Sequence, residues 1–226
     1  MLAFVIRRLV QATMVMMVVA FIAFTLFQYV GDPVLSMLGQ DATPEQRDEL
    51  REGLGLNRPF YIQFGHFVAN AIQGDFGLSY RQGRKVSTLI QERLPATIEL
   101  SLVAAALALV VGVPMGVYTA LRRKGLLSNL FLAISLVGVS LPTFLIGILL
   151  ILLFAVQLGW LPSYGRGETV ALGWWTTGFL TPAGWRHLIL PSITLGLFQM
   201  TLIMRLVRSE MLEVLRTDYI KFARAR

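Results

Sequence analysis

Residues 187–207 read HLILPSITLGLFQMTLIMRLV and residues 208–226 read RSEMLEVLRTDYIKFARAR, and the change after Val207 decides the fold. The first stretch is almost wholly apolar, and about 20 such residues cross a hydrocarbon core about 30 Å thick. The second stretch keeps an apolar row at helical spacing, with charged residues away from that row. A helix of this kind beside a membrane span either lies on lipid or is bound by another protein. The row consists of Met211, Leu215, Tyr219 and Phe222.

Composition places the whole chain in the membrane class. Hydrophobic residues make up 55% and charged residues 15%, and the mean hydropathy is +0.66. Three further runs are long enough to span, namely Leu9–Val30, Thr97–Ala120 and Leu130–Leu158, and the only acid in the four runs is Glu99. The sequence therefore predicts an all-α polytopic membrane protein with four spans. It contains no cysteine and predicts no metal site.

The net charge of +7 reflects orientation in the membrane. With the N-terminus inside, the cytoplasmic segments hold 11 basic and 3 acidic residues, whereas the external segments 31–96 and 159–186 hold 9 of each. An excess of Lys and Arg on the cytoplasmic side is the usual pattern in membrane proteins. The charge therefore favours a cytoplasmic N-terminus and does not indicate a nucleic-acid partner.

Two helices are predicted in the external region 31–96. Thr43–Gln46 has the pattern of a capping box, with Thr as N-cap and Pro at the first helical position, and this helix should end by Gly53–Gly55. A second helix begins near Pro59 and stops at Gly74. Its apolar face should lie on the outer membrane surface or over the mouth of a pathway. That face carries Phe60, Phe64, Phe67 and Ala71.

The other external loop, 159–186, carries all four tryptophans of the chain. Indoles favour the membrane interface, so the loop is expected to be interfacial or re-entrant, with anchoring and ligand stacking both open. Within the spans, prolines mark either hinges or ordinary tight helix packing. The candidate hinges are Pro114, Pro142 and Pro191. The candidate translocation-path residues are the polar residues Glu99, Ser140, Thr143 and Gln199.

Energy-converting chemistry is missing from the sequence. No lysine stands in a Gly-Lys-Ser/Thr phosphate loop, and neither a nucleophilic triad nor a paired carboxylate is evident. The spans also lack a chain of ionisable residues suited to carrying protons. The sequence thus predicts a non-enzymatic passage without its own ATPase site.

Seven stretches of the sequence carry motifs that occur together in a fixed order, namely 4–9, 31–33, 54–59, 74–79, 93–97, 158–162 and 206–226. Taken in order, they resemble the binding-protein-dependent ABC transporter permeases, and within them the first permease subunit of the dipeptide/oligopeptide/nickel branch. The resemblance implies the type I ABC importer permease fold, with four of its six transmembrane helices plus an external helical region between helices 1 and 2. It also implies that the sequence ends inside the cytoplasmic EAA loop.

This resemblance divides the chain into four parts. Residues 1–30 are the cytoplasmic N-terminus and first span, and 31–96 form a periplasmic helical region. Residues 97–207 hold three spans with a cytoplasmic loop at 121–129 and the Trp-rich periplasmic loop at 159–186. Residues 208–226 begin the EAA coupling loop, although Lys221 stands where the general motif has Glu.

The resemblance also implies partners and a transport reaction. The expected partners are a second homologous permease, two ATP-binding subunits that bind ATP and Mg, a periplasmic or lipid-anchored substrate-binding protein and the inner-membrane bilayer. No cofactor is expected on this chain, and the substrate is expected to be a di- or oligopeptide. A nickel chelate, glutathione or another small solute is an alternative, as is an ATP-independent channel or carrier or a membrane scaffold. The ATPase-coupling residues implied are Thr217, Asp218, Tyr219, Ile220, Phe222, Ala223 and Arg224.

Overall fold

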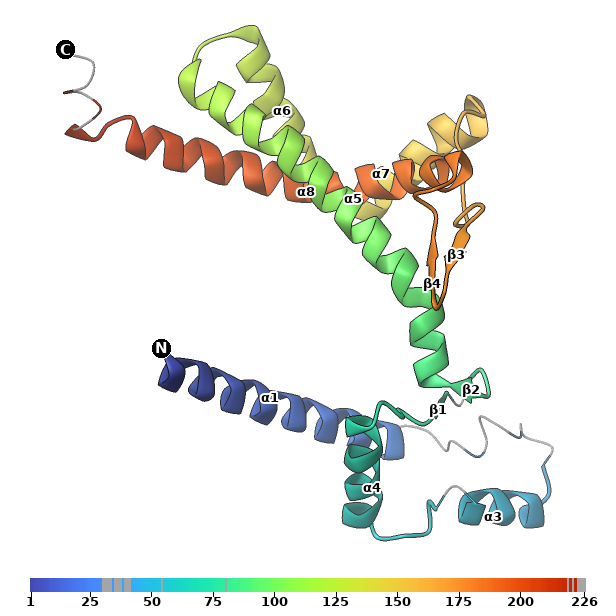
Figure 1. Ribbon diagram of the computed structural model, residues 1–226. Helices are drawn as coiled ribbons and strands as arrows, with labels where there is room; N and C mark the ends of the chain where they lie inside the picture. Colours follow the sequence, from blue (N-terminus) through green and yellow to red (C-terminus); the bar gives the residue numbers. More distant parts are fainter. Residues whose placement is uncertain are drawn as a thin grey trace. The chain divides into compact units, whose positions relative to one another are not determined.

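The computed structural model describes residues 1–29, 34, 38, 42–53, 55–79, 81–218, 220 and 222. The chain divides into two compact units, Met1–Glu92 and Arg93–Arg226, and helix α5 (Val86–Leu121) begins in the first and continues into the second (Figure 1). Within the described residues, three helices are long and apolar enough to cross a membrane, or four if one sharply bent pair counts as a span. The predicted all-α membrane architecture is confirmed.

The first unit begins with helix α1 (Leu2–Tyr29), whose apolar face is exposed along nearly its whole length. Helix α3 (Pro44–Gly53) follows and starts at the predicted capping box. The backbone N–H of Thr43 donates to Gln46 Oε1 (3.1 Å), and the N–H of Gln46 donates to Thr43 Oγ1 (3.4 Å). These reciprocal bonds satisfy N–H groups that have no partner inside the helix.

Helix α4 (Phe60–Ile72) packs its aromatic face against the end of α1. Phe24 of α1 lies 5.4 Å from Phe60, 5.6 Å from Phe64 and 5.4 Å from Phe67, measured between ring centroids. Phe21 makes edge-on contacts with Phe60 and Phe64. The predicted apolar face of α4 therefore packs on the end of the first span through ring contacts at favourable distances, and its location at the membrane surface or a pathway mouth stays a prediction.

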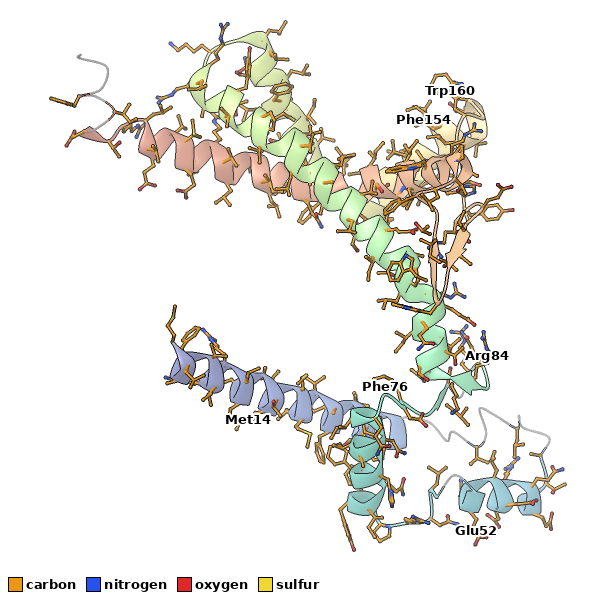
Figure 2. All side chains as sticks on the ribbon, in the orientation of Figure 1. Met14, Glu52, Phe76, Arg84, Phe154 and Trp160 are labelled. Atoms are coloured by element: carbon orange, nitrogen blue, oxygen red, sulfur yellow. The ribbon has the colours of Figure 1, made fainter. Side chains whose placement is uncertain are left out.

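A short hairpin closes the first unit. Strands β1 (Leu78–Ser79) and β2 (Arg84–Lys85) pair antiparallel and lead directly into α5. Arg84, labelled in Figure 2, donates from Nη1 to Glu92 Oε2 (3.0 Å) and from Nη2 to Glu92 Oε1, which raises the pKa of Arg84 through hydrogen bonding and charge. The pair is exposed, so its contribution to stability is small.

The second unit contains the remaining membrane helices. After α5 come α6 (Leu126–Ser140), α7 (Thr143–Leu150), the π-helix η1 (Ile151–Gln157) and the long helix α8 (Pro182–Val214). Both α6 and α7 pack against α8. A small antiparallel hairpin of β3 (Val170–Leu172) and β4 (Trp175–Thr177) lies between η1 and α8.

The span predicted at 130–158 is interrupted. The chain bends by 109° between helix α6 and the continuous α7–η1 segment. Leu141 is extended (φ −94°, ψ 136°) and Pro142 is the N-cap of α7. A residue before proline is disfavoured in the helical region, and proline cannot donate a backbone hydrogen bond, so the helix stops here. The apolar run predicted as a span is therefore two helices, α6 and α7–η1, and Pro142, a predicted hinge, lies at the break between them.

The core of this unit forms where α5 crosses α8. Ala108 and Met115 of α5 pack with Met200 and Met204 of α8, and all four are buried. Partly buried side chains from α6 and α8 complete this cluster, namely Phe131, Leu132, Leu197 and Ile203. Small residues at such a crossing let two membrane helices approach closely.

Candidate functional site

Glu99 is the polar centre of the second unit. Its side chain lies on α5 and the residue is only 1% exposed. Oε2 accepts a hydrogen bond from Nη2 of Arg166 (3.0 Å) and Oε1 accepts one from the backbone N–H of Gly178 (3.1 Å). A buried carboxylate is costly unless it is paired and hydrogen-bonded, and both requirements are met here.

Arg166 extends this network to strand β4. Its Nη1 donates to Thr176 Oγ1 (2.7 Å), and its Nη2 donates to the backbone carbonyl of Thr176 (2.6 Å). One guanidinium therefore binds the carboxylate of α5 and the backbone of β4 at the same time. We call the group of Glu99, Arg166, Thr176 and Gly178 the Glu99 junction.

The loop then passes directly into α8. Thr181 is the N-cap of α8, and its Oγ1 accepts from the N–H of Gly184 (3.0 Å) and donates to the carbonyl of Glu168 (2.6 Å). Gly178 and Gly184 are in close contact, since a Cβ on Gly184 would lie 2.1 Å from the Gly178 carbonyl oxygen. The start of α8 is thereby held against the residue that binds Glu99.

Aromatic residues complete the loop. Trp185 stacks on Phe179 with ring centroids 5.2 Å apart, and its Nε1 donates to the Phe179 carbonyl (2.9 Å). Trp160 lies 6.0 Å from Phe154 of η1, and both are labelled in Figure 2. Trp174 at the hairpin tip is 73% exposed. Trp174 and Trp175 also contact each other edge to face, with ring centroids 5.5 Å apart, so the Trp-rich loop is a folded structure in which all four tryptophans make ring contacts.

The other candidate path residues lie away from this junction. Ser140 ends α6 and Thr143 begins α7, so both flank the 109° break, and both are exposed. Gln199 lies on α8 and is also exposed. The structure therefore gives Glu99 a different environment from the other three, because its carboxylate is already bound by the loop.

The candidate hinges also differ among themselves. Pro114 and Pro191 lie inside the continuous helices α5 and α8, whereas Pro142 lies at the break. Beside Pro191, Ser192 is 1% exposed, and its hydroxyl has no hydrogen-bond partner among the residues that the structure describes. A proline inside a helix removes one backbone hydrogen bond, so α8 is weakened at Pro191 and α5 at both Pro95 and Pro114.

The predicted coupling segment follows α8. Helix α8 ends with the N–H of Leu215 donating to the carbonyl of Met211 (3.0 Å), and Thr217 Oγ1 donates to the carbonyl of Val214 (2.6 Å). Asp218, Ile220 and Phe222 are helical, and Phe222 is 68% exposed. Tyr219, Ala223 and Arg224 lie outside the described residues.

Sequence reasoning missed Arg166 and Gly178 as partners of Glu99. A signal was available for the arginine, because an acid inside a span needs a cation and the following external loop contains only Arg166 and Arg186. The sequence alone does not say which of the two arginines binds Glu99. In the structure Arg186 donates to the carbonyl of Trp160 (2.7 Å), and Arg166 is the partner of Glu99. Gly178 binds Glu99 through its backbone N–H, a group that nearly every residue has, so the sequence pattern could not predict this contact.

Comparisons with known proteins identify the family of this chain through two family models. Residues 1–101 match the family described as "Binding-prot-dependent transport system membrane comp, N-term", and residues 112–226 match "Binding-protein-dependent transport system inner membrane component". The chain belongs to the binding-protein-dependent transport permease family. It therefore has the type I ABC importer permease fold and is a multi-pass membrane protein.

Similar permeases cover the full length of this chain. A putative peptide transport system permease protein of Brucella abortus (strain 2308) is 41% identical over 100% of this chain and 70% of its own. The dipeptide transport system permease protein DppB of Alkalihalophilus pseudofirmus is 36% identical over 100% and 72%. The glutathione transport system permease protein GsiC of Escherichia coli (strain K12) is 34% identical over 100% and 69%. This permease family accounts for the order of motifs noted in the sequence.

Proposed function

We propose that this permease passes a di- or oligopeptide from a periplasmic binding protein into the cytoplasm, driven by ATP hydrolysis on partner subunits. The observation that carries the proposal is full-length similarity to relatives named as peptide and dipeptide transport permeases. The sequence itself contains no phosphate-binding lysine motif, which agrees with an ATPase site on another chain.

The assembly proposed comprises this chain, a second homologous permease, two ATP-binding subunits and a periplasmic or lipid-anchored binding protein. ATP and Mg belong to the ATP-binding subunits in this proposal. In this proposal the N-terminus is cytoplasmic, because basic residues are in excess on the side of Arg7, Arg8 and residues 122–124. The inner membrane is the proposed location, in agreement with the description of the matching family. The Trp-rich loop and α3–α4 are then periplasmic.

The coupling to ATP hydrolysis is assigned to the segment after α8. Exposed apolar residues on a short helix fit a groove on a partner protein, as Phe222 illustrates with its exposed ring. We assign this role to Thr217, Asp218, Tyr219, Ile220, Phe222, Ala223 and Arg224. The translocation path is assigned to Ser140, Thr143 and Gln199, with Glu99 at its periplasmic end, and the hinges to Pro114, Pro142 and Pro191.

Reconstitution tests this proposal. The full permease complex in proteoliposomes should take up a labelled dipeptide only when both ATP and the binding protein are present. The variants Tyr219→Ala and Arg224→Glu should abolish most uptake while membrane insertion is unchanged. Tyr61→Ala is the matched control, because Tyr61 lies on α4 and is 74% exposed.

Two results would overturn the proposal. Flux without ATP through this chain alone would identify a channel or carrier. Wild-type uptake by both coupling variants would identify a scaffold.

Glutathione is the second candidate substrate, since one relative is named as a glutathione transport permease. An excess of unlabelled glutathione that abolishes dipeptide binding and uptake would favour it over peptides.

A further inference from the structure

The Glu99 junction joins the two longest helices of the second unit at one end. Glu99 belongs to α5, and through Gly178 and Thr181 it is connected to the first turn of α8. The four residues from Gly178 to Thr181 are further held by a hydrogen bond from the N–H of Thr181 to the Gly178 carbonyl (3.2 Å). The distance between Glu99 on α5 and the first turn of α8 is therefore restrained by these hydrogen bonds.

The same two helices contact each other again farther along. A Cβ on Gly196 of α8 would lie 3.2 Å from the Ala104 carbonyl of α5, and one on Gly112 of α5 would lie 2.9 Å from the Met200 carbonyl. Helix α8 continues from the junction to Val214 without a break and then leads into the segment 215–222. Displacement at the C-terminal end of α8 therefore acts on a helix whose first turn is held to α5 through Gly178 and Thr181.

Opening the junction is unfavourable. Separating Arg166 from Glu99 leaves a charge inside the protein without its partner, which is far more costly than exposing a solvated ion pair. The side chain of Glu99 is 2% exposed and that of Arg166 is 25% exposed, so water reaches only the arginine side. Thr177, between the two bonded residues of the loop, is 6% exposed.

We propose that Glu99 and Arg166 are positioning residues that keep the junction closed throughout the transport cycle, so that α5 and α8 move as one body. This inference rests on the proposed function, because it assigns the junction a part in coupling. With the junction closed, displacement at the cytoplasmic end of α8 becomes a movement of both helices. With the junction open, α8 tilts against α5 and ATP hydrolysis is no longer converted into transport.

The absence of cysteine from the sequence allows a direct test. A single Thr177→Cys thiol in the complete complex should react slowly with a membrane-impermeant maleimide, equally slowly without nucleotide and after trapping with ATP and vanadate. Adding Glu99→Gln should raise the labelling rate about tenfold or more, because one partner of a buried ion pair is lost. Trp174→Cys, at the 73% exposed tip, is the reference for a fully reactive position.

Uptake measured per ATP hydrolysed distinguishes a positioning role from a purely structural one. Glu99→Gln should keep ATP hydrolysis and lose most uptake per ATP, whereas Glu168→Gln, an exposed acid of the same loop, should match the wild type. Arg166→Gln should repeat the effect of Glu99→Gln, and the double variant should lose no more than either single variant. If the Glu99→Gln chain does not insert into the membrane, Arg166→Gln can be used for the same labelling and uptake measurements.

Three outcomes overturn the inference. Fast labelling of Thr177→Cys in the vanadate-trapped wild type would show that the junction opens during the cycle. Normal uptake per ATP in a Glu99→Gln complex with fast labelling would show that the junction is not needed for coupling. Slow labelling in both junction variants would show that the ion pair does not hold the loop. The comparison of labelling with and without Glu99→Gln in the absence of nucleotide needs neither ATP nor transport, so it still decides whether the ion pair holds the loop if the wild type shows no ATP-dependent uptake and the proposed function fails.

Discussion

Gly116 of α5 lies directly against the backbone of Met204 on α8. A Cβ on Gly116 would be 2.8 Å from the Met204 carbonyl oxygen and 2.8 Å from Cβ of Val207. Gly112 lies one helical turn earlier, and a Cβ there would be 2.9 Å from the Met200 carbonyl oxygen. The spacing of four residues on both helices places the two contacts one above the other, and it brings the backbones close enough for extensive packing.

Gly116→Ala should separate α5 from α8. Real Cβ atoms do not approach a carbonyl this closely, and backbone cannot rotate away as a long side chain can, so the helices must shift. Alanine gains up to about 1 kcal/mol in helix propensity, whereas overpacking a tight contact costs about 1–3 kcal/mol. The thermal unfolding midpoint in detergent, followed by circular dichroism, should therefore fall.

Gly65→Ala is the matched control for this substitution. Gly65 lies in the helix α4, and a Cβ there would meet nothing within 4 Å. Its midpoint should stay the same or rise slightly, since only the propensity gain remains. Equal midpoints for the two variants would mean that the crossing tolerates a methyl group and that its close approach is not required.

Phe24→Ala should release α4 from α1. Phe24 contacts three aromatic rings of α4, and because it is only half-buried its removal should cost less than the about 3–5 kcal/mol typical of a fully buried aromatic side chain. Hydrogen exchange of α4 amides in nanodiscs should become faster, whereas Tyr61→Ala on the exposed side should leave it unchanged. If both variants exchange alike, α4 is held by something other than these rings.

The sequence predicted the elements whose signals are local. The capping box at Thr43–Gln46, the stop of α4 near Gly74 and the apolar runs all depend on residues close together in the chain, and the structure has each of them. Helix ends were less well predicted: α5 begins at Val86 and α8 extends from Pro182 to Val214. An apolar run predicts only the part of a helix that lies in lipid. Helices α5 and α8 continue beyond their apolar runs as polar helical turns, so their ends could not be predicted from hydrophobicity.

The interactions that were missed are long-range or involve the backbone. Glu99 and Arg166 are 67 positions apart, and Glu99 and Gly178 are 79 apart, so no spacing rule connects them. The break at Pro142 had a local signal, but a proline inside an apolar run is compatible with either a kink or a stop. The extended conformation of Leu141 distinguishes the two, and packing of both halves on α8 stabilises it.

Pro142→Ala should make the break between α6 and α7 less sharp. Without proline, Leu141 regains access to the helical region, and residue 142 regains a backbone N–H for a helical hydrogen bond. Spin labels on Leu136→Cys and Leu149→Cys, both exposed positions, should move farther apart as the 109° angle relaxes. Pro114→Ala in α5 should leave this distance unchanged. An unaltered distance in Pro142→Ala would assign the bend to packing against α8 alone.

The start of α3 should depend on pH through Glu45. Hydrogen bonds from its own backbone N–H and from the Thr43 side chain lower the pKa of Glu45 below its ordinary value. A carboxyl group whose pKa is lower in the folded state stabilises that state above its unfolded pKa, and the contribution is lost as the pH falls through the folded pKa. The negative charge also suits the first turn of a helix.

Chemical shifts of residues 44–53 in an isotope-labelled chain measure this effect. Helical shifts should weaken as the solution is acidified through the Glu45 titration, and Glu45→Gln should remove that dependence. Thr43→Ala should weaken the same shifts at neutral pH, because loss of an N-cap costs about 1 kcal/mol. Glu52→Gln, in the last turn, changes an acid of the same helix far from the cap and should retain the wild-type pH dependence. A Glu45→Gln chain that still loses helical shifts on acidification would place the pH sensitivity of α3 in another group.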